Sequence, residues 1–331
     1  MVRHVVLKHA VDSLPTAADF EVVERQAPIP GDGWLTVRSA YQSLDPYIGS
    51  RLRGRHMGEP APAPGEDLPG FCVGEVMTSG VAEFSPGDVV VGEMGWTEFG
   101  RMWAGDARKV DPALPLSTHV GLLGMPGLTA WAGVTQLAKV GAGDIFTVDA
   151  AAGPVGGTAG QIARLLGARV VGVAGGAAKC ALVRETYGFD AVVDYRQEGW
   201  IRQLADQTAP GATVHFENVG LSVLMPVMQQ LQLYGRVVLC GLAEHYHADS
   251  GPAQIPLGAI VGKRAQVLGL VVYDYYLRLA EWVALARPWL ADGSIVFAED
   301  IGAGVESAPL QFERLMRGQN QGKALVRMGD A

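Results

Sequence analysis

DAAAGPVGGTAGQIAR, residues 149–164, lies between two apolar runs, IFTVDA and RVVGVA. This order predicts a strand, a glycine-rich turn, a helix that begins near Pro154, and a second strand. Gly153 and Gly156 have no Cβ atom, so the chain can turn tightly there and approach a bound group closely. Because the start of a helix directs unpaired N–H groups at negative charge, the stretch predicts a site for the pyrophosphate of a dinucleotide.

The glycine pattern is looser than the strict GxGxxG form, since Ala151 stands where that form has its first glycine. The alternative is that the glycines serve only the close packing of a helix against a strand. The strand, helix and second strand that the fingerprint requires are all present around the motif, and they favour the dinucleotide site.

The residues after the second strand favour the phosphorylated nicotinamide cofactor. An NAD site normally has an Asp or Glu about twenty residues beyond the turn, where it binds the ribose hydroxyls. Residues 150–184 contain no acid, and the second strand is followed by two glycines, two alanines and then Lys179. An ammonium attracts a 2′-phosphate and a carboxylate repels it, so the sequence predicts NADPH. The alternative for Lys179 is a solvated helix lysine.

Composition excludes several classes of protein. The chain has 331 residues, 26 basic against 34 acidic side chains, and a net charge of −8, without the basic run that nucleic-acid binding needs. No apolar run reaches the roughly eighteen residues that span a bilayer, and charges interrupt the opening MVRHVVLKHAVDSLP. Cys72, Cys180 and Cys240 are too dispersed for a disulfide framework and are expected as small buried hydrophobes. We expect a cytoplasmic protein that acts on a small molecule and has no nucleic-acid or membrane partner.

The pattern of apolar runs in the sequence changes near Val120. Before it, short alternating runs such as WLTVRSAY are separated by Gly and Pro clusters, which predicts a mostly β region. After it, six apolar runs alternate with helical segments, which predicts a doubly wound parallel sheet. The expected helices cover residues 154–166, 178–187, 200–207, 222–233 and 275–290. The tail GKALVRM predicts one more strand, which would return to the first domain.

Seven segments of the sequence point to one family when they are taken together. They are SLDPYIGSRL, GMPGLTAWAG, AAAGPVGGTAGQIARLLGARVVG, ENVG, YGRVVLCG, VVY and GQNQGKALV. In this order they resemble the zinc-independent medium-chain dehydrogenase/reductases of the leukotriene B4 dehydrogenase/prostaglandin reductase and alkenal or enone double-bond reductase type. The resemblance covers nearly the whole chain. It implies a Rossmann NADP-binding domain, residues 120–295, inserted in a GroES-like mostly β domain, residues 1–119 and 296–331, and a homodimer.

The resemblance also implies roles for individual residues. Tyr273 would be catalytic, and Tyr47 and Tyr246 would approach the substrate or the nicotinamide ribose. The cofactor-binding set would be Gly153, Pro154, Val155, Gly156, Lys179, Tyr195, Asn218, Asn320, Met125 and Thr129. The alternative for the tyrosines is half-buried packing with a hydrogen-bonded hydroxyl, and for Asn320 a role in shaping a turn. Asp274, Tyr275 and Tyr276 depart from the family's usual arginine after the tyrosine, so the substrate range does not carry over.

A metal is not expected from the sequence. A zinc alcohol dehydrogenase needs an early cysteine, a Gly-His-Glu segment and a further cysteine or acid, and this chain lacks that set. The pair His245 and His247 has no third ligand nearby in sequence.

Without a metal, hydride addition to the β-carbon of an enone is easier to catalyse than addition to a carbonyl, because hydrogen-bond donors can stabilise the delocalised enolate. The sequence therefore predicts an NADPH-dependent reductase of the carbon–carbon double bond of α,β-unsaturated ketones or aldehydes, with the enolate protonated at the α-carbon. The alternatives are an NADPH:quinone oxidoreductase and a non-catalytic NADPH-binding protein.

Overall fold

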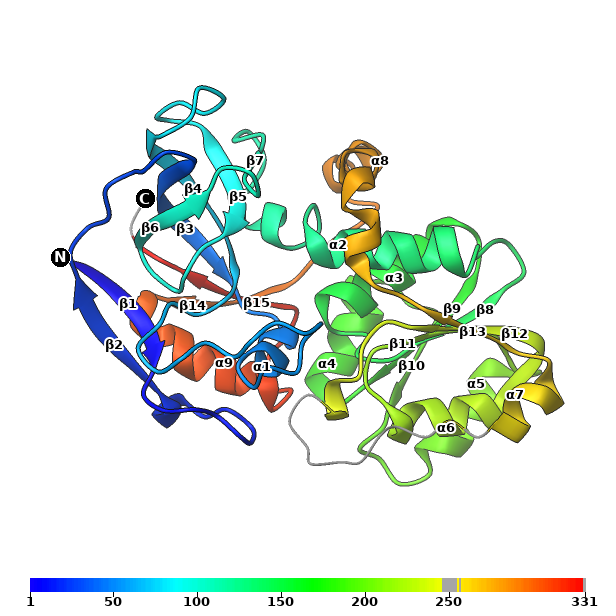
Figure 1. The fold of residues 1–331 in the computed structure, drawn as a ribbon. Helices are drawn as coiled ribbons and strands as arrows, with labels where there is room; N and C mark the ends of the chain where they lie inside the picture. Colours follow the sequence, from blue (N-terminus) through cyan, green and yellow to red (C-terminus); the bar gives the residue numbers. More distant parts are fainter. Residues whose placement is uncertain (246–254, 256, 330–331) are drawn as a thin grey trace. The chain divides into compact units, whose positions relative to one another are not determined.

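The computed structural model describes residues 1–245, 255 and 257–329 (Figure 1). The described residues divide into two compact units, the first made of residues 1–121 and 299–329 and the second of residues 122–245, 255 and 257–298. The predicted boundaries were 119/120 and 295/296, whereas the units meet at 121/122 and 298/299. The second unit is therefore an insertion in the first. Tyr246, which is predicted to approach the substrate, lies outside the described residues.

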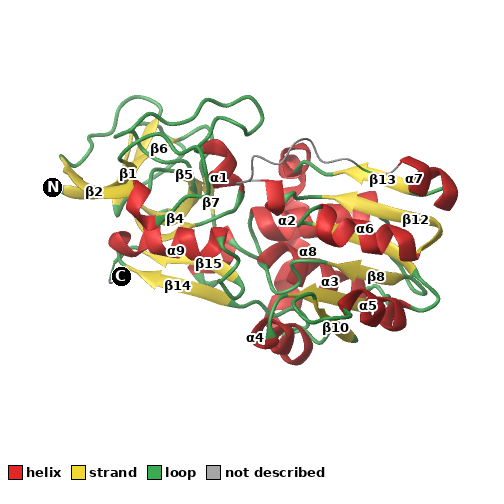
Figure 2. Ribbon diagram, turned by 90° about the horizontal axis from the view of Figure 1, so that it is seen from below, coloured by secondary structure: helices red, strands yellow, loops and turns green. Residues whose placement is uncertain are grey.

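The first unit is built on an antiparallel sheet in the order β14-β15-β3-β4-β5-β7, with β6 pairing β3 and a separate pair β1-β2. C-terminal β15 pairs antiparallel with β3, and β14 pairs parallel with β15; Figure 2 shows these two strands beside α9. The elements are β1 (Val2–Leu7), β2 (Phe20–Arg25), β3 (Trp34–Ser43), α1 (Tyr47–Arg51), β4 (Phe71–Ser79), β5 (Val89–Glu93), β6 (Phe99–Trp103), β7 (Arg108–Lys109), β14 (Glu299–Ala303), α9 (Ala308–Met316) and β15 (Lys323–Arg327).

An aromatic cluster joins the two ends of the chain within this unit. Trp96 is completely buried; its ring stacks on Phe20 at 5.7 Å and meets Phe312 of α9 edge-on at 5.2 Å. Phe312 also meets Phe20 edge-on at 6.1 Å. Large buried aromatic side chains contribute much of the hydrophobic stabilisation of a core. The C-terminal segment thus completes a core that the first hundred residues begin.

The second unit contains a parallel sheet in the order β10-β9-β8-β11-β12-β13. With the strands renumbered from β8, this is the order 3-2-1-4-5-6 of a doubly wound nucleotide-binding sheet, so the predicted Rossmann class is confirmed. Its strands are β8 (Ile145–Val148), β9 (Arg169–Ala174), β10 (Ala191–Asp194), β11 (Ala212–Glu217), β12 (Leu231–Leu239) and β13 (Gln266–Gly269). Ligands of such sheets bind outside the carboxyl ends of the strands, where the order reverses between β8 and β11.

Helices cover both faces of this sheet. In Figure 1, α2, α3 and α8 lie on one face and α5, α6 and α7 on the other. The helices are α2 (Met125–Trp131), α3 (Pro154–Leu165), α4 (Ala177–Ala181), α5 (Trp200–Thr208), α6 (Leu221–Gln230), α7 (Leu257–Lys263) and α8 (Leu279–Ala291), with α4 continued by a π-helical turn, Leu182–Thr186. Across the described residues, no helix combines the length and apolar character that crossing a bilayer requires.

Two helices differ from their predicted bounds. The helix expected over residues 222–233 ends at Gln230, because Leu231 already begins β12 and is completely buried there. The helix expected over residues 275–290 begins at Leu279 and is preceded by a 3-10 segment, Val272–Arg278. An apolar run that enters a strand directly from a helix gives no period by which to separate them.

Candidate functional site

The glycine-rich turn joins β8 to α3 at the point where the sheet order reverses. Gly153 is the N-cap of α3 and Pro154 its first residue, so the first turn presents backbone N–H groups without helical partners. A Cβ atom on Gly156 would lie 2.6 Å from the carbonyl oxygen of Ala150, closer than real contacts allow. The glycine therefore permits the helix to start directly above the end of the strand, as a dinucleotide site requires.

The left-handed residue of this turn is an alanine. Ala150 has a φ of 43°, whereas Gly153 has a φ of −85°. A non-glycine residue in the left-handed region stores backbone strain and is held there by its surroundings. The amide of Ala151 donates to the Val173 carbonyl of β9, and Gly153 donates to the carbonyl of Ala150. These bonds fix the turn before any ligand binds.

The loop after β9 lies against the residues that follow β10. A Cβ atom on Gly175 would lie 2.7 Å from the ring of Tyr195, and one on Gly176 would lie 3.3 Å from a guanidinium nitrogen of Arg196. Lys179 follows three residues later in α4. The structure therefore brings the predicted Lys179 and Tyr195 into one neighbourhood and adds Arg196, whose guanidinium lies 6.0 Å from the Tyr195 ring centre.

An acid also lies here, on β10. Asp194 accepts the backbone N–H groups of Gly176 at 2.9 Å and Arg196 at 3.0 Å, and these bonds lower its pKa against the raising effect of burial. Its carboxylate holds the two loops together. Arg196 was not predicted, because the charge that reads the ribose is expected behind the second strand; the sequence DYR at the end of the third strand is the signal that could have indicated it.

Asn218 lies directly after β11 and contacts the end of β8. Its side-chain amide donates to the backbone carbonyl and to Oδ1 of Asp149, both at 3.2 Å, and its backbone N–H donates to the same Oδ1 at 2.6 Å. Both side-chain bonds use Nδ2, so these contacts do not use the acceptor capacity of the amide oxygen Oδ1.

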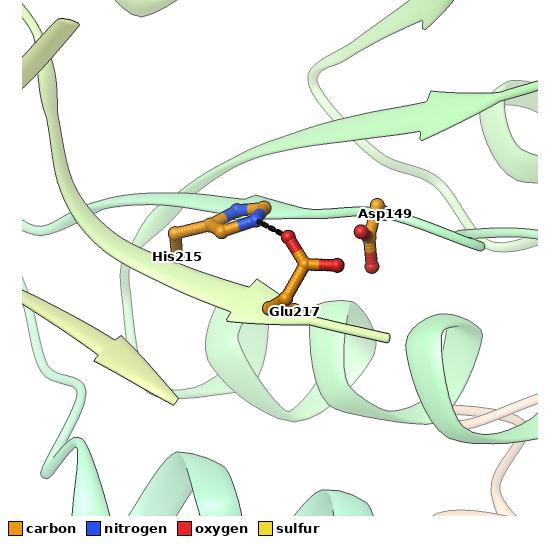
Figure 3. Close-up of side chains that lie close together, drawn as sticks. All are labelled: Asp149, His215 and Glu217. Carbon is orange, nitrogen blue, oxygen red and sulfur yellow. Dashed lines mark hydrogen bonds and ion pairs between the residues drawn. The ribbon is translucent and has the colours of Figure 1, made fainter. Parts of the chain in front are cut away.

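Behind Asn218 is a buried polar cluster that sequence analysis missed (Figure 3). His215 pairs with Thr147 in the parallel register of β11 and β8. Side chains two residues apart share one face of a strand, so Glu217 comes beside Asp149. His215, Glu217 and Asp149 are all completely buried, and His215 Nε2 lies 3.0 Å from Glu217 Oε2. The sequence signal was the alternation of polar residues, T-x-D and H-x-E, at the ends of two neighbouring strands.

Burial dominates the protonation of this cluster. It raises the pKa of Asp149 well above its usual range, with the Glu217 charge adding to the effect, and it raises the pKa of Glu217. Burial lowers the pKa of His215 although the Asp149 charge opposes this. Charged forms are costly in a dry interior, so the cluster keeps a proton on its carboxyl groups rather than on the imidazole.

Within the described residues, Asp149, His215 and Glu217 are the group whose ligand atoms, all within 4.8 Å of one another, could surround a metal ion. The hydrogen bonds do not fit one. Glu217 Oε1 accepts the N–H groups of Val219 at 2.7 Å and Gly220 at 2.6 Å, and Asp149 Oδ1 accepts that of Asn218 at 2.6 Å. N–H groups that point at these oxygens repel a cation, so we derive no metal chemistry from this cluster.

Four other predicted residues lie in the second unit. Met125 and Thr129 lie in α2, where the Thr129 hydroxyl donates to the Met125 carbonyl at 2.7 Å. Tyr273 follows the carboxyl end of β13, is 39% exposed, and stacks on Tyr276 with ring centres 5.8 Å apart. Val155 is half-buried in the first turn of α3. All are in the unit that carries the glycine-rich turn.

Tyr47 and Asn320 belong to the first unit. Tyr47 begins α1 with its ring 5.0 Å from His56, and the buried Asn320 side chain donates to the Gly322 carbonyl at 2.8 Å. The bond of Asn320 closes a turn, as its alternative reading expects.

A buried ion pair links the two motifs that carry these residues. Lys323 Nζ donates to the Leu44 carbonyl at 2.6 Å and to Asp45 Oδ1 at 3.1 Å. Burial lowers the pKa of Lys323, and the Asp45 charge opposes that effect. The ammonium thus holds the loop before Tyr47 against the strand after Asn320.

Comparison with known proteins agrees with this architecture. Residues 3–110 match the family model of the N-terminal domain of oxidoreductases, and residues 154–289 match the model of zinc-binding dehydrogenases. The chain is 36% identical to the NADPH-dependent curcumin reductase of Escherichia coli, covering 98% of this chain and 96% of that protein. It is 34% identical to the NADP(+)-dependent 2-alkenal reductase of Nicotiana tabacum, with coverage of 98% and 96%. The crystal structure of CurA from Vibrio vulnificus in complex with NADPH superposes with a TM-score of 0.93, at 34% identity over 99% of this chain and all of that one.

Fold and site together define a two-domain nicotinamide-dependent oxidoreductase. More specifically, the chain belongs to the medium-chain dehydrogenase/reductase family, in its branch of enone and alkenal reductases. The family and the fold that the seven motifs predict are both confirmed.

Proposed function

We propose that this chain uses NADPH to reduce the carbon–carbon double bond of α,β-unsaturated ketones or aldehydes. The main support is full-length similarity, at 34–36% identity, to a curcumin reductase and a 2-alkenal reductase, both named for NADPH or NADP. The cofactor end of the site fits, because residues 150–184 contain no acid and a lysine and an arginine flank the loop at Gly175 and Gly176. The chain is accordingly an NADPH-dependent oxidoreductase.

The proposed cofactor-binding residues each contact a different part of NADPH. The first turn of α3, Gly153–Gly156, would bind the pyrophosphate through backbone N–H groups, with Met125 and Thr129 of α2 at the entry. Lys179, Tyr195 and Arg196 would bind the 2′-phosphate, and Asn218 and Asn320 the nicotinamide end. Bound NADPH supplies the hydride that adds to the β-carbon of the substrate.

Tyr273 is the proposed proton donor. A phenol at the carboxyl edge of the sheet can hold the enolate oxygen by a hydrogen bond and protonate the α-carbon directly or through water. Its exposed position after β13 leaves it accessible to a substrate. Tyr47 is proposed to line the substrate site from the first unit, and Tyr246, outside the described residues, to do the same.

The reaction is proposed to proceed without zinc, in the cytoplasm, and in a homodimer. Cys72, Cys180 and Cys240 are free thiols, which suits a reducing compartment. Among the described residues β13 pairs only with β12, and exposed Val271 and Leu277 lie near this edge. An unpaired strand edge with apolar residues beside it favours association with a second copy.

A substrate panel tests the reaction. We expect NADPH oxidation with α,β-unsaturated ketones and aldehydes, a product saturated at the former double bond, and activity unchanged after dialysis against a chelator. The control is a simple quinone assayed at the same concentration. Faster turnover of the quinone would favour the quinone reductase, and NADPH binding without turnover of any acceptor would favour a binding protein.

Replacement of Lys179 by Ala tests the phosphate site. A charged hydrogen bond contributes about 1.5–3 kcal/mol, so NADPH binding should weaken about 10- to 100-fold while NADH binding changes little. Arg196→Ala should act in the same direction. Lys263→Ala is the matched control, since Lys263 ends α7 just before β13, at the opposite edge of the sheet. Equal losses for both cofactors, measured by fluorescence titration, would remove Lys179 from the phosphate site.

Replacement of Tyr273 by Phe tests the proton donor. General acid catalysis contributes about 10²- to 10⁴-fold, so kcat should fall about 100-fold or more while the Kd for NADPH stays within about twofold. Tyr234→Phe, at an exposed position near the start of β12, serves as control. Steady-state kinetics that show an unaltered rate for Tyr273→Phe would refute its role.

Sedimentation equilibrium tests the homodimer. We expect twice the 35.0 kDa mass of the chain, and a shift toward the single chain when Leu277, which is 100% exposed, is replaced by Glu. Substitution of Leu165, an exposed leucine of α3, by Glu is the control. A wild-type protein that sediments as a single chain would contradict the assembly.

A further inference from the structure

The geometry points to a positioning role for the buried cluster Asp149–His215–Glu217: it holds the turn Asn218–Gly220 in its ligand-binding shape, with one proton shared by the carboxyl groups of Asp149 and Glu217. This inference rests on the proposed function, because it assigns the turn to the nicotinamide half of the site. The cluster residues act through Asn218 and are positioning residues rather than catalytic ones.

Three consecutive backbone N–H groups converge on the two carboxyl groups. The N–H of Asn218 donates to Asp149 Oδ1 at 2.6 Å, and that of Gly220 donates to Glu217 Oε1 at 2.6 Å. The N–H of Val219 is shared between Glu217 Oε1 at 2.7 Å and Asp149 Oδ2 at 3.2 Å. The carboxyl groups of two side chains thus hold the turn immediately after β11 through its backbone N–H groups. Asp149 also accepts a hydrogen bond from Asn218 Nδ2.

These contacts fit one proton shared by the two carboxyl groups. Three of the four carboxyl oxygens accept N–H bonds, whereas Glu217 Oε2 instead faces His215 Nε2 at 3.0 Å. On the other side of the ring, His215 Nδ1 lies 3.0 Å from the Thr147 hydroxyl. A neutral imidazole with its proton on Nδ1 donates to Thr147 and accepts from a protonated Glu217, and one with its proton on Nε2 donates to Glu217 while a protonated Asp149 does the same. In both arrangements the imidazole is neutral and the two carboxyl groups hold one proton between them.

The other titratable groups around the cluster support one negative charge rather than two. Cys240, just after β12, is half-buried, and desolvation together with the charge of the carboxyl groups raises its thiol pKa to about 12, so it stays neutral. The charge of Glu244 raises the pKa of Glu217 further. Glu244 accepts the N–H of Ser222 at 3.3 Å, and its own backbone N–H donates to the Val219 carbonyl at 2.8 Å. If both carboxyl groups of the cluster were ionised, the second negative charge would lie beside Glu244 with no cation among these groups to stabilise it.

Infrared spectroscopy of the protein without cofactor tests the shared proton. Wild type should show the carbonyl stretch of a buried neutral carboxylic acid, and the double variant Asp149→Asn/Glu217→Gln should lack it. The His215 ring nitrogens should give the NMR signature of a neutral imidazole. A wild-type spectrum without this band, or an imidazolium signature for His215, would overturn the assignment.

NADPH titration and kinetics test the positioning role. Glutamine at 217 keeps an acceptor for Val219 and Gly220 and gives His215 a donor, so the Kd for NADPH and kcat should change by no more than about threefold. Asparagine at 149 turns an NH₂ toward an N–H of the turn, so kcat/KM should fall about tenfold or more. Asp206→Asn, at an exposed position of α5, is the matched control and should leave both unchanged.

A double-mutant cycle with Asn218→Ala keeps the test decisive if Asp149→Asn folds poorly. Asn218 is half-buried, and its substitution leaves all three backbone N–H groups in place. If Asp149 acts through Asn218, Asn218→Ala alone should lower kcat/KM, and Asp149→Asn should add little in its presence. Additive losses, or a loss of thermal stability with unchanged kcat and Kd, would reduce the cluster to a structural role. Failure of the proposed reaction is separate, because it would show as inactive wild type with the infrared pattern intact.

Discussion

The parallel register of β8 with β11 is the constraint on which the second unit depends. It pairs Thr147 with His215 and so brings the ends of two strands, with Asp149 and Glu217, to one place. The chain leaves those strands in opposite directions, which opens the point where a ligand can bind. The close approach of Gly156 to the Ala150 carbonyl then sets the start of α3 at the same point. Register and close approach together position the donors that face a dinucleotide.

Burial of two carboxyl groups beside this point is costly, and the backbone compensates for the cost. An isolated buried carboxylate is strongly destabilised, but one that accepts several N–H bonds is not. The turn after β11 supplies those N–H groups, and in exchange its own conformation is fixed without a ligand. A hydrophobic pair of the same volume would leave the N–H groups of Asn218, Val219 and Gly220 without acceptors. The cluster therefore links the stability of the strand ends to the shape of the site.

Much of this architecture follows from local sequence pattern. The runs IFTVDA, RVVGVA and TVHFEN alternate with helices at the spacing of a parallel sheet, and the glycines at 153 and 156 mark the turn. What local pattern does not contain is register. The contact of Arg196 with the loop at Gly176, and that of Asp149 with Glu217, depend on which strands are neighbours and by how much they are shifted. The start of β12 at Leu231 was missed for a related reason, since an apolar run is compatible with both a helix end and a strand.

The same reasoning separates the two ends of the cofactor site. At the proposed phosphate end, the Asp194 carboxylate links the loop at Gly176 to Arg196 through their backbone N–H groups. At the proposed nicotinamide end, Asn218 is held by two bonds from its side chain and one from its backbone to a completely buried residue. Hydride transfer needs accurate placement of the reacting atoms, whereas a phosphate anchor needs only charge at the right distance. The bonds that fix Asn218 therefore lie where geometry would decide the rate.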